Sequence, residues 1–439
     1  MKTVSALIIC CFFSPAVWAI DPRADIESAM ELISEGRHEL ARTYLAPALI
    51  APQIHSSERS RAYYFRGFSY LAESMPVSAR KDFHRALEFN PNNQAALVSL
   101  GRIYSGGQGV EADAELGFEL FSQAAQLGYT PALFHQGYAY LLGQGVAKDL
   151  IKAREILAQA ADQGHGDARM SLAASYRPDH VTTPEPQQAE HWYQRAYESG
   201  RHEALLAMAY MKRDGEFGDA DPVGAFQLFE QAAAEGVAAA HVSLGYAYLV
   251  GEGTDAQPKA AYEAYLAGAN AGLPEAYLGL GHLYEHGIGV KADVKKSSDW
   301  YLKAAYVGNL DAQLRLVGVF LAEETEAGYA EAVSWARRAT DSGQAQAYND
   351  YAWMLATAKY DPLRNGVLAV NQAEKAVDLD PIAPYLDTLA AAYAETGNFV
   401  RAVEVQEQAL KALTEAEADL RGELETRLQY YLRNEPWRE

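Results

Sequence analysis

The stretch that decides the fold runs from Leu244 to Gly272 and reads LGYAYLVGEGTDAQPKAAYEAYLAGANAG. It predicts a short apolar helix, a glycine-rich corner, an alanine-rich second helix and a closing glycine. The same arrangement returns along the chain, and its closing glycine recurs at a spacing of 36 residues five times and 35 once, at Gly128, Gly164, Gly200, Gly236, Gly272, Gly308 and Gly343. A period of this size is typical of a solenoid built from stacked helix pairs.

A second set of residues keeps nearly the same period. The first helix of each copy carries an aromatic residue, at Tyr104, Tyr140, Tyr176, Tyr210, Tyr248, Tyr284 and Phe320. Within the copy quoted above, Gly245 removes a side chain where the second helix must cross closely, and Gly251 supplies a left-handed cap. One helix pair is too small to be stable alone, so neighbouring pairs should cover its apolar faces.

This pattern resembles the Sel1-like repeat family. The resemblance is plainest in Leu100–Gly128, Gly137–Gly164, Leu244–Gly272 and Leu280–Gly308. Three further segments keep the helices but change the corner, namely Ala173–Gly200, Ala207–Gly236 and Val317–Gly343. We therefore assign residues 95–343 to Sel1-like repeats.

The flanking segments resemble the related tetratricopeptide repeat. Small, aromatic and proline residues occupy that motif's positions at Gly67, Tyr70, Ala79, Phe83, Ala86 and Pro91, although Arg66 replaces the expected leucine. We assign 23–94 and 344–415 to such repeats, and 416–439 to a capping helix and tail. The resemblance implies an all-α fold, a right-handed α-solenoid superhelix of about eleven helix-turn-helix units with a C-terminal capping helix.

The N-terminus has the features of a signal peptide. Lys2 precedes an apolar run from Val4 to Phe13, and small residues precede the expected cleavage after Ala19. Both cysteines, Cys10 and Cys11, lie in this segment, so the mature chain would lack thiols, which excludes cysteine catalysis, zinc-thiolate sites and disulfides. We expect residues 1–19 to direct export to the periplasm, with release from the cell as an alternative. No later stretch is apolar for long enough to predict a transmembrane segment.

The charge of the chain restricts its partners. The formal net charge is −21 and becomes −22 once Lys2 is removed, which disfavours nucleic acid and anionic lipid surfaces. Partners should be proteins, neutral glycans or basic surfaces.

One short string is typical of a metal enzyme. Residues 282–286 read HLYEH, matching the His-x-x-Glu-His string of inverted zincins, and on a helix His282 and His286 would lie one turn apart. However, Gly281 and Tyr284 are the small and aromatic anchors of the repeat, Gly287 ends the helix at once, and no third ligand on a long catalytic helix is visible. A paired histidine suits zinc or nickel, so these residues favour incidental metal binding over hydrolysis. We predict no catalytic residue, no cofactor and no dedicated metal site.

Two other motifs are weaker. The glycine corners, such as Gly107-Gln108-Gly109-Val110, close a helix and lack the Gly-Lys-Ser/Thr of a nucleotide loop. Asp214, Asp219 and Asp221 miss the alternating spacing of a calcium loop, which favours a solvated acidic corner.

The concave surface of a helical solenoid is lined by first helices. The residue after each small anchor should face this groove, and Phe134 and Leu141 should share the face of Tyr138. The predicted partner-binding residues are Phe68, Arg102, Phe134, Tyr138, Leu141, Met208, Tyr246 and His282, with Ala174 and Gly318 at equivalent positions. Alternatively, these side chains pack between successive first helices and contact no partner.

These features lead to three functional hypotheses. The first is an exported, non-catalytic scaffold or assembly factor of the bacterial envelope that binds another envelope or secreted protein, as the resemblance implies. The second is a protein that binds peptidoglycan or another polysaccharide, for which tyrosine and tryptophan platforms in the groove would be the signature. The third is an enzyme, either a zinc hydrolase or a β-lactam hydrolase by analogy with cysteine-rich relatives, whose paired cysteines this chain lacks.

Overall fold

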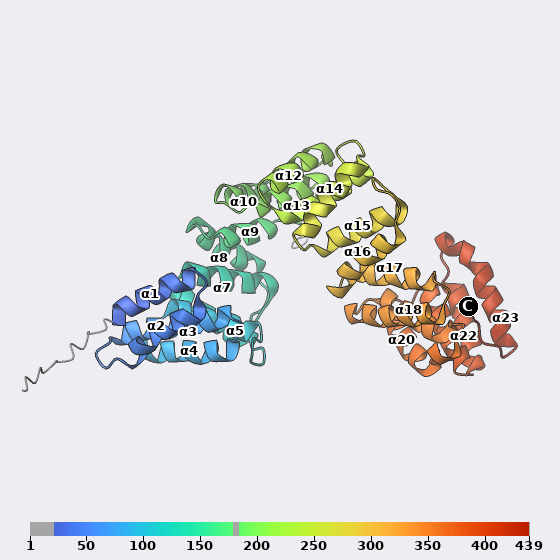
Figure 1. The fold of residues 1–439 in the computed structure, drawn as a ribbon, viewed down its shortest axis with the longest axis horizontal. Helices are drawn as coiled ribbons and strands as arrows, with labels where there is room; N and C mark the ends of the chain where they lie inside the picture. Colours follow the sequence, from blue (N-terminus) through green and yellow to red (C-terminus); the bar gives the residue numbers. More distant parts are fainter. Residues whose placement is uncertain (1–21, 179–183, 439) are drawn as a thin grey trace, which may run out of the picture. The chain divides into compact units, whose positions relative to one another are not determined.

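The computed structural model describes residues 22–178 and 184–438, and within these ranges every regular element is a helix (Figure 1). The predicted signal peptide, residues 1–19, lies outside the described residues. A search of the described helices finds none with the length and apolar character needed to cross a bilayer. The described residues fall into two compact units, which are divided between Ala204 and Leu205.

The N-terminal unit consists of consecutive helix pairs. In chain order they are α1 (Pro22–Ser34) with α2 (His38–Ile50), α3 (Ser56–Ala72) with α4 (Pro76–Phe89), α5 (Gln94–Ser105) with α6 (Ala114–Gln126), α7 (Thr130–Leu142) with α8 (Leu150–Asp162), and α9 (Gly166–Ala174) with α10 (Pro186–Glu198).

The C-terminal unit begins within α11 and continues the same alternation. Its pairs are α11 (Glu203–Arg213) with α12 (Pro222–Ala234), α13 (Ala238–Val250) with α14 (Pro258–Asn270), α15 (Pro274–His286) with α16 (Val294–Tyr306), α17 (Leu310–Leu321) with α18 (Glu326–Ala339), α19 (Ala345–Thr357) with α20 (Gly366–Leu379), and α21 (Ala383–Glu395) with α22 (Phe399–Ala412). A last helix, α23 (Arg421–Leu432), follows them. The described residues thus form eleven helix pairs and a final helix, which confirms the predicted all-α solenoid.

Where the two helices of a pair cross, a glycine of the first helix leaves room for an aromatic ring of the second. A Cβ atom on Gly245 of α13 would lie 2.6 Å from the ring of Tyr265 on α14, and Gly281 of α15 meets Tyr301 of α16 in the same way. Gly67 of α3 gives the same room to Phe83, at 2.7 Å. Because these distances are shorter than any ordinary contact, only glycine allows the close crossing that the sequence predicts.

Glycine is also required at the turns. All seven closing glycines have positive φ angles, between 71° and 91°, which a residue with a Cβ atom adopts at a cost. The second glycine of a regular corner has a further role. A Cβ on Gly253 or Gly289 would overlap the backbone oxygen of Pro222 or Pro258, the first residue of the second helix in the preceding pair. These corners therefore pack directly against the neighbouring repeat.

The C-terminal end of the array is closed by α23. Arg427 of this helix pairs with the buried Asp387 of α21 at 2.7 Å, and Gln406 of α22 donates to the same carboxylate at 2.7 Å. Leu424 and Tyr431 of α23 are buried in the core of the last repeats. The last helix acts as the cap that the sequence predicts.

The tail after α23 is more ordered than its polar sequence indicates. The Trp437 ring packs edge-on against Tyr430 with the ring centroids 5.1 Å apart, and Arg438 forms an ion pair with Glu395. One tryptophan and one arginine therefore attach the tail to α21 and α23.

Candidate functional site

A cavity of about 760 Å³ lies in the C-terminal unit, and we call it the C-terminal groove. The first helices of five successive pairs line it: α11, α13, α15, α17 and α19. Second helices add three aromatic rings, those of Phe229, Tyr265 and Tyr301. This arrangement agrees with the expectation that first helices form the binding wall of a helical solenoid.

The aromatic floor of the groove follows from the glycine anchors. Gly279, which lines the groove, leaves room for Tyr265 just as Gly245 does, since a Cβ there would lie 2.7 Å from the ring. Burial raises the pKa of Tyr265 to about 12. Burial also raises the pKa of Tyr301, whose hydroxyl donates to Glu285 at 2.5 Å. Both phenols therefore stay neutral at physiological pH.

The polar wall of the groove is mainly acidic. Four carboxylates line it, those of Glu252, Glu275, Asp311 and Asp350, together with two guanidinium groups, those of Arg213 and Arg315. Burial raises the pKa of Asp350, an effect that hydrogen bonds from Asn349 and Gln346 partly offset. Arg213 is already paired with Asp214 at 2.7 Å. Acidic side chains therefore outnumber basic ones among the described residues that line the groove.

The structure places three of the predicted residues in the C-terminal unit. Tyr246 and His282 line the groove, and the Tyr246 side chain is half exposed. Met208 does not face it: it is 6% exposed and lies in the core. Met208 lies 36 residues before Leu244. By contrast, Tyr210 lies 36 residues before the groove residue Tyr246, and Tyr210 itself lines the groove. The predicted register was therefore displaced by two residues in α11.

The remaining predicted residues lie in the N-terminal unit. Phe68, Arg102 and Tyr138 are exposed, and Arg102 and Tyr138 line a smaller cavity of about 300 Å³. Phe134 is half-buried, and its ring stacks on that of His165 with centroids 4.7 Å apart. Leu141 is 2% exposed and belongs to the hydrophobic core of α7 and α8, so its assignment to the groove was wrong.

A half-buried histidine that the repeat pattern does not single out, His135, also lines this smaller cavity. The His135 ring stacks on Phe121, with centroids 4.7 Å apart, and contacts Phe134. Burial, together with a smaller effect of Arg102, lowers the pKa of His135 to about 4. His135 is therefore neutral at physiological pH.

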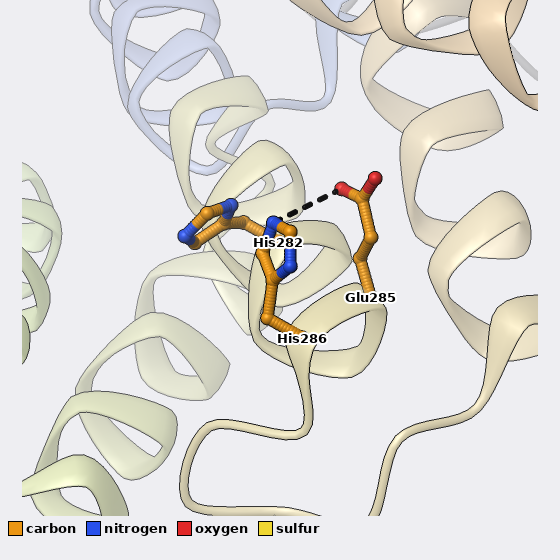
Figure 2. A group of neighbouring side chains, drawn as sticks. All are labelled: His282, Glu285 and His286. Carbon is orange, nitrogen blue, oxygen red and sulfur yellow. Dashed lines mark ion pairs between the residues drawn. The ribbon is translucent and has the colours of Figure 1, made fainter.

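The histidine string forms a compact cluster at the end of α15 (Figure 2). The two imidazoles of His282 and His286 lie next to each other, and Glu285 points its carboxylate toward His286, with 3.7 Å between Oε2 and Nε2. One potential ligand atom from each of the three residues lies within 4.8 Å of the others. Burial lowers the pKa of His282, and His286 and Arg315 lower it further, so this imidazole is neutral.

Among the described residues, the widened corner between α11 and α12 holds no group of three potential metal ligands. Asp221 caps α12 by accepting from the Gly224 amide at 2.8 Å, and it pairs with Lys212 at 3.1 Å. Asp214 is paired with Arg213. These ion pairs fit the solvated acidic corner that the sequence favours over a calcium site.

The family model of the Sel1 repeat matches the sequence six times, over residues 94–129, 130–165, 168–200, 202–237, 238–273 and 274–309. The chain is a Sel1-like repeat protein. Each match covers one first helix, one second helix and, at or near its end, the closing glycine. The Sel1-like assignment of 310–343 and the tetratricopeptide assignment of both flanks lie outside the matched residues and stay predictions.

Solved structures with a similar fold include other Sel1-like repeat proteins. A Sel1 repeat protein from Oxalobacter formigenes is 25% identical, with a TM-score of 0.45, and the match covers 64% of this chain and 96% of that one. A protective antigen present in uropathogenic Escherichia coli strains is 23% identical, with a TM-score of 0.47, over 94% and 92% of the two chains. No curated protein sequence matches the chain.

In this Sel1-like repeat protein the groove extends beyond the matched repeats. Helices α11, α13 and α15 belong to the last three matches, whereas α17 and α19 follow them. The groove is therefore a property of consecutive helix pairs and does not depend on a single repeat.

Proposed function

We propose that this protein is an exported, non-catalytic scaffold that holds a partner protein in the C-terminal groove. The observation that carries the proposal is the groove itself, about 760 Å³ in volume and lined by five successive first helices. Tyr246, half exposed in this wall, is the kind of residue that anchors protein interfaces, because it buries much area and has few rotatable bonds.

The partner is another protein of the envelope or a secreted protein, and the scaffold serves its assembly. Export rests on the signal peptide predicted at residues 1–19 and on the lack of cysteine after Cys11. Cell fractionation of the full chain with a C-terminal tag tests this. We expect the protein in the periplasmic fraction and a variant without residues 2–19 in the cytoplasm. Equal distribution of the two forms would contradict export.

Site-specific photocrosslinking in cells tests the groove. A photoreactive amino acid at position 246 should give a discrete protein adduct, because this side chain faces the cavity. The control is position 306, where Tyr306 is 69% exposed but lies outside the groove. Adducts of the same size from both positions, or none from position 246, would contradict the proposed docking surface.

Binding of peptidoglycan or another polysaccharide is the alternative, since Tyr210, Tyr246, Tyr265 and Tyr301 line the groove. Stacking on sugar rings usually needs an open aromatic face. Tyr265 and Tyr301 are buried, and none of the described residues that line the groove is a tryptophan. Cosedimentation with purified peptidoglycan separates the two candidates, and we expect the protein to stay in the supernatant.

A further inference from the structure

We propose that His282, Glu285 and His286 bind a transition-metal ion such as Zn²⁺ at the edge of the C-terminal groove. This site goes beyond the scaffold function and does not depend on it. The sequence alone predicts no dedicated metal site, because no third ligand on a longer helix is visible in it. In the structure, Glu285 offers a third ligand from the same turn of α15.

The histidine pair has the geometry of a helical chelate. His282 and His286 are one turn apart on α15, with ring centroids 4.5 Å apart. The three ligand atoms lie within 4.8 Å of one another, whereas the ligands of a tetrahedral zinc ion are separated by about 3.4 Å, given bonds of about 2.1 Å. The side chain of His286 is 46% exposed, so the imidazole is free to rotate the remaining distance.

Glu285 is held in place by a residue of the next helix. The Tyr301 hydroxyl on α16 donates to Oε2 of Glu285 at 2.5 Å. The same oxygen lies 3.7 Å from Nε2 of His286, so this hydrogen bond fixes the carboxylate beside the imidazole. A hydrogen bond from outside the ligand set that orients a ligating carboxylate is typical of protein metal sites.

The donor set selects the class of ion. Two imidazole nitrogens and one carboxylate oxygen suit Zn²⁺ or Ni²⁺, whereas Ca²⁺ and Mg²⁺ prefer oxygen ligands alone. Three protein ligands leave one tetrahedral position open, and His282 also lines the groove, so a partner could supply the fourth ligand.

One nearby charge opposes a bound cation. Arg315 on α17 lines the same cavity and acts electrostatically on His282. The Arg315 guanidinium should reduce the affinity of the site for the cation without abolishing binding, because the Glu285 carboxylate offsets its positive charge. Replacing Arg315 by glutamine should therefore tighten metal binding.

Zinc titration of the metal-free full chain, followed by equilibrium dialysis and metal analysis, tests the site. We expect one Zn²⁺ per chain in the micromolar range, and a loss of about tenfold or more in H282Q and in H286Q, since even residues outside the ligand set commonly change metal affinity by this amount. E285Q should weaken binding and R315Q should tighten it. His241→Gln on α13 is the matched control and should bind like the wild type.

The site would be contradicted if the double variant H282Q/H286Q bound zinc as tightly as the wild type, or if H241Q lost as much affinity as H286Q. Unchanged affinity in E285Q would contradict the role of the third ligand. Circular dichroism of each variant, at the temperature of the titration, verifies that the helices are retained. Because the His286 side chain is exposed, H286Q should disturb the fold least.

Discussion

At the scale of single residues, glycine determines how closely the helices pack. Tyr301 is fully buried against Gly281, and Tyr265 fills the space between Gly245 and Gly279. The glycines therefore create both the crossing of each helix pair and the aromatic floor of the groove. Not every helical glycine has this role, since a Cβ atom on Gly318 of α17 would meet nothing within 4 Å.

Gly281→Ala and Gly318→Ala form a matched pair of substitutions. In the first, the new Cβ overlaps the Tyr301 ring, and we expect a loss of about 1–3 kcal/mol in the free energy of unfolding. In the second, alanine fits without contact in the helix, and we expect a gain of about 0.5–1 kcal/mol. Urea denaturation of the full chain, followed by circular dichroism, measures both. Equal effects of the two substitutions would show that the ring contact is unimportant.

His135 should make the N-terminal unit sensitive to acid. Its pKa is about 4 in the folded state, below the ordinary 6.5, because burial disfavours the charged imidazole. Its contribution to stability is therefore complete above pH 6.5 and is lost as the pH falls through 4. The full effect is about 3 kcal/mol.

The variant His135→Phe keeps a ring against Phe121 but cannot be protonated. We expect its stability to fall less than that of the wild type between neutral pH and pH about 4. Denaturant midpoints of both proteins at the two pH values provide the measurement. The carboxylates titrate in both proteins, so parallel losses would contradict the role of His135.

At the scale of helices, the repeat period predicts most of the structure. The closing glycines locate the end of each helix pair because their positive φ angles are a local requirement of the turn. The interval from Tyr176 to Tyr210 is 34 residues and the next is 38, and this irregularity marks the position where the predicted register failed. Had the constant period of 36 been kept, Tyr210 would have replaced Met208 among the groove residues.

Other parts of the site depend on contacts between helices that a period does not encode. Leu141 is on the expected helix, yet it packs among Ile156, Leu157 and Leu172 and is removed from the surface. The hydrogen bond from Tyr301 to Glu285 joins α15 and α16 and could not be predicted from the string in α15 alone. The repeat therefore predicts which helix lines the groove, while side-chain packing decides which residues are accessible.

The cap of the array depends on one buried ion pair. The side chains of Arg427 and Asp387 are 12% and 7% exposed, so replacing Arg427 leaves the Asp387 carboxylate buried without a counter-charge, with only the hydrogen bond from Gln406. We expect Arg427→Met to cost about 3–5 kcal/mol of unfolding free energy. In the double variant D387L/R427M most of this loss should be recovered, because no charge is left buried. Thermal unfolding of both variants measures the effect, and a double variant as unstable as R427M would contradict it.

At the scale of the whole molecule, eleven helix pairs are grouped into two compact units, and each contains a cavity lined by residues of its first helices. The cavity of the C-terminal unit is the larger and the more acidic. Under the proposed scaffold function, exposed anchors in the wall of the C-terminal groove should dominate the affinity for the partner. Tyr246 is the clearest anchor, because it is half exposed and comes from the repeat whose sequence decides the fold.

The most direct test is the affinity of the partner captured at position 246, measured by titration calorimetry against the wild type, Tyr246→Ala and Tyr306→Ala. We predict that Y246A weakens binding by about 30-fold or more, as expected for a central anchor worth about 2 kcal/mol, while Y306A binds like the wild type and both variants keep the wild-type circular dichroism spectrum. A folded Y246A variant that binds the partner as tightly as the wild type would contradict the assignment of the C-terminal groove as the docking surface.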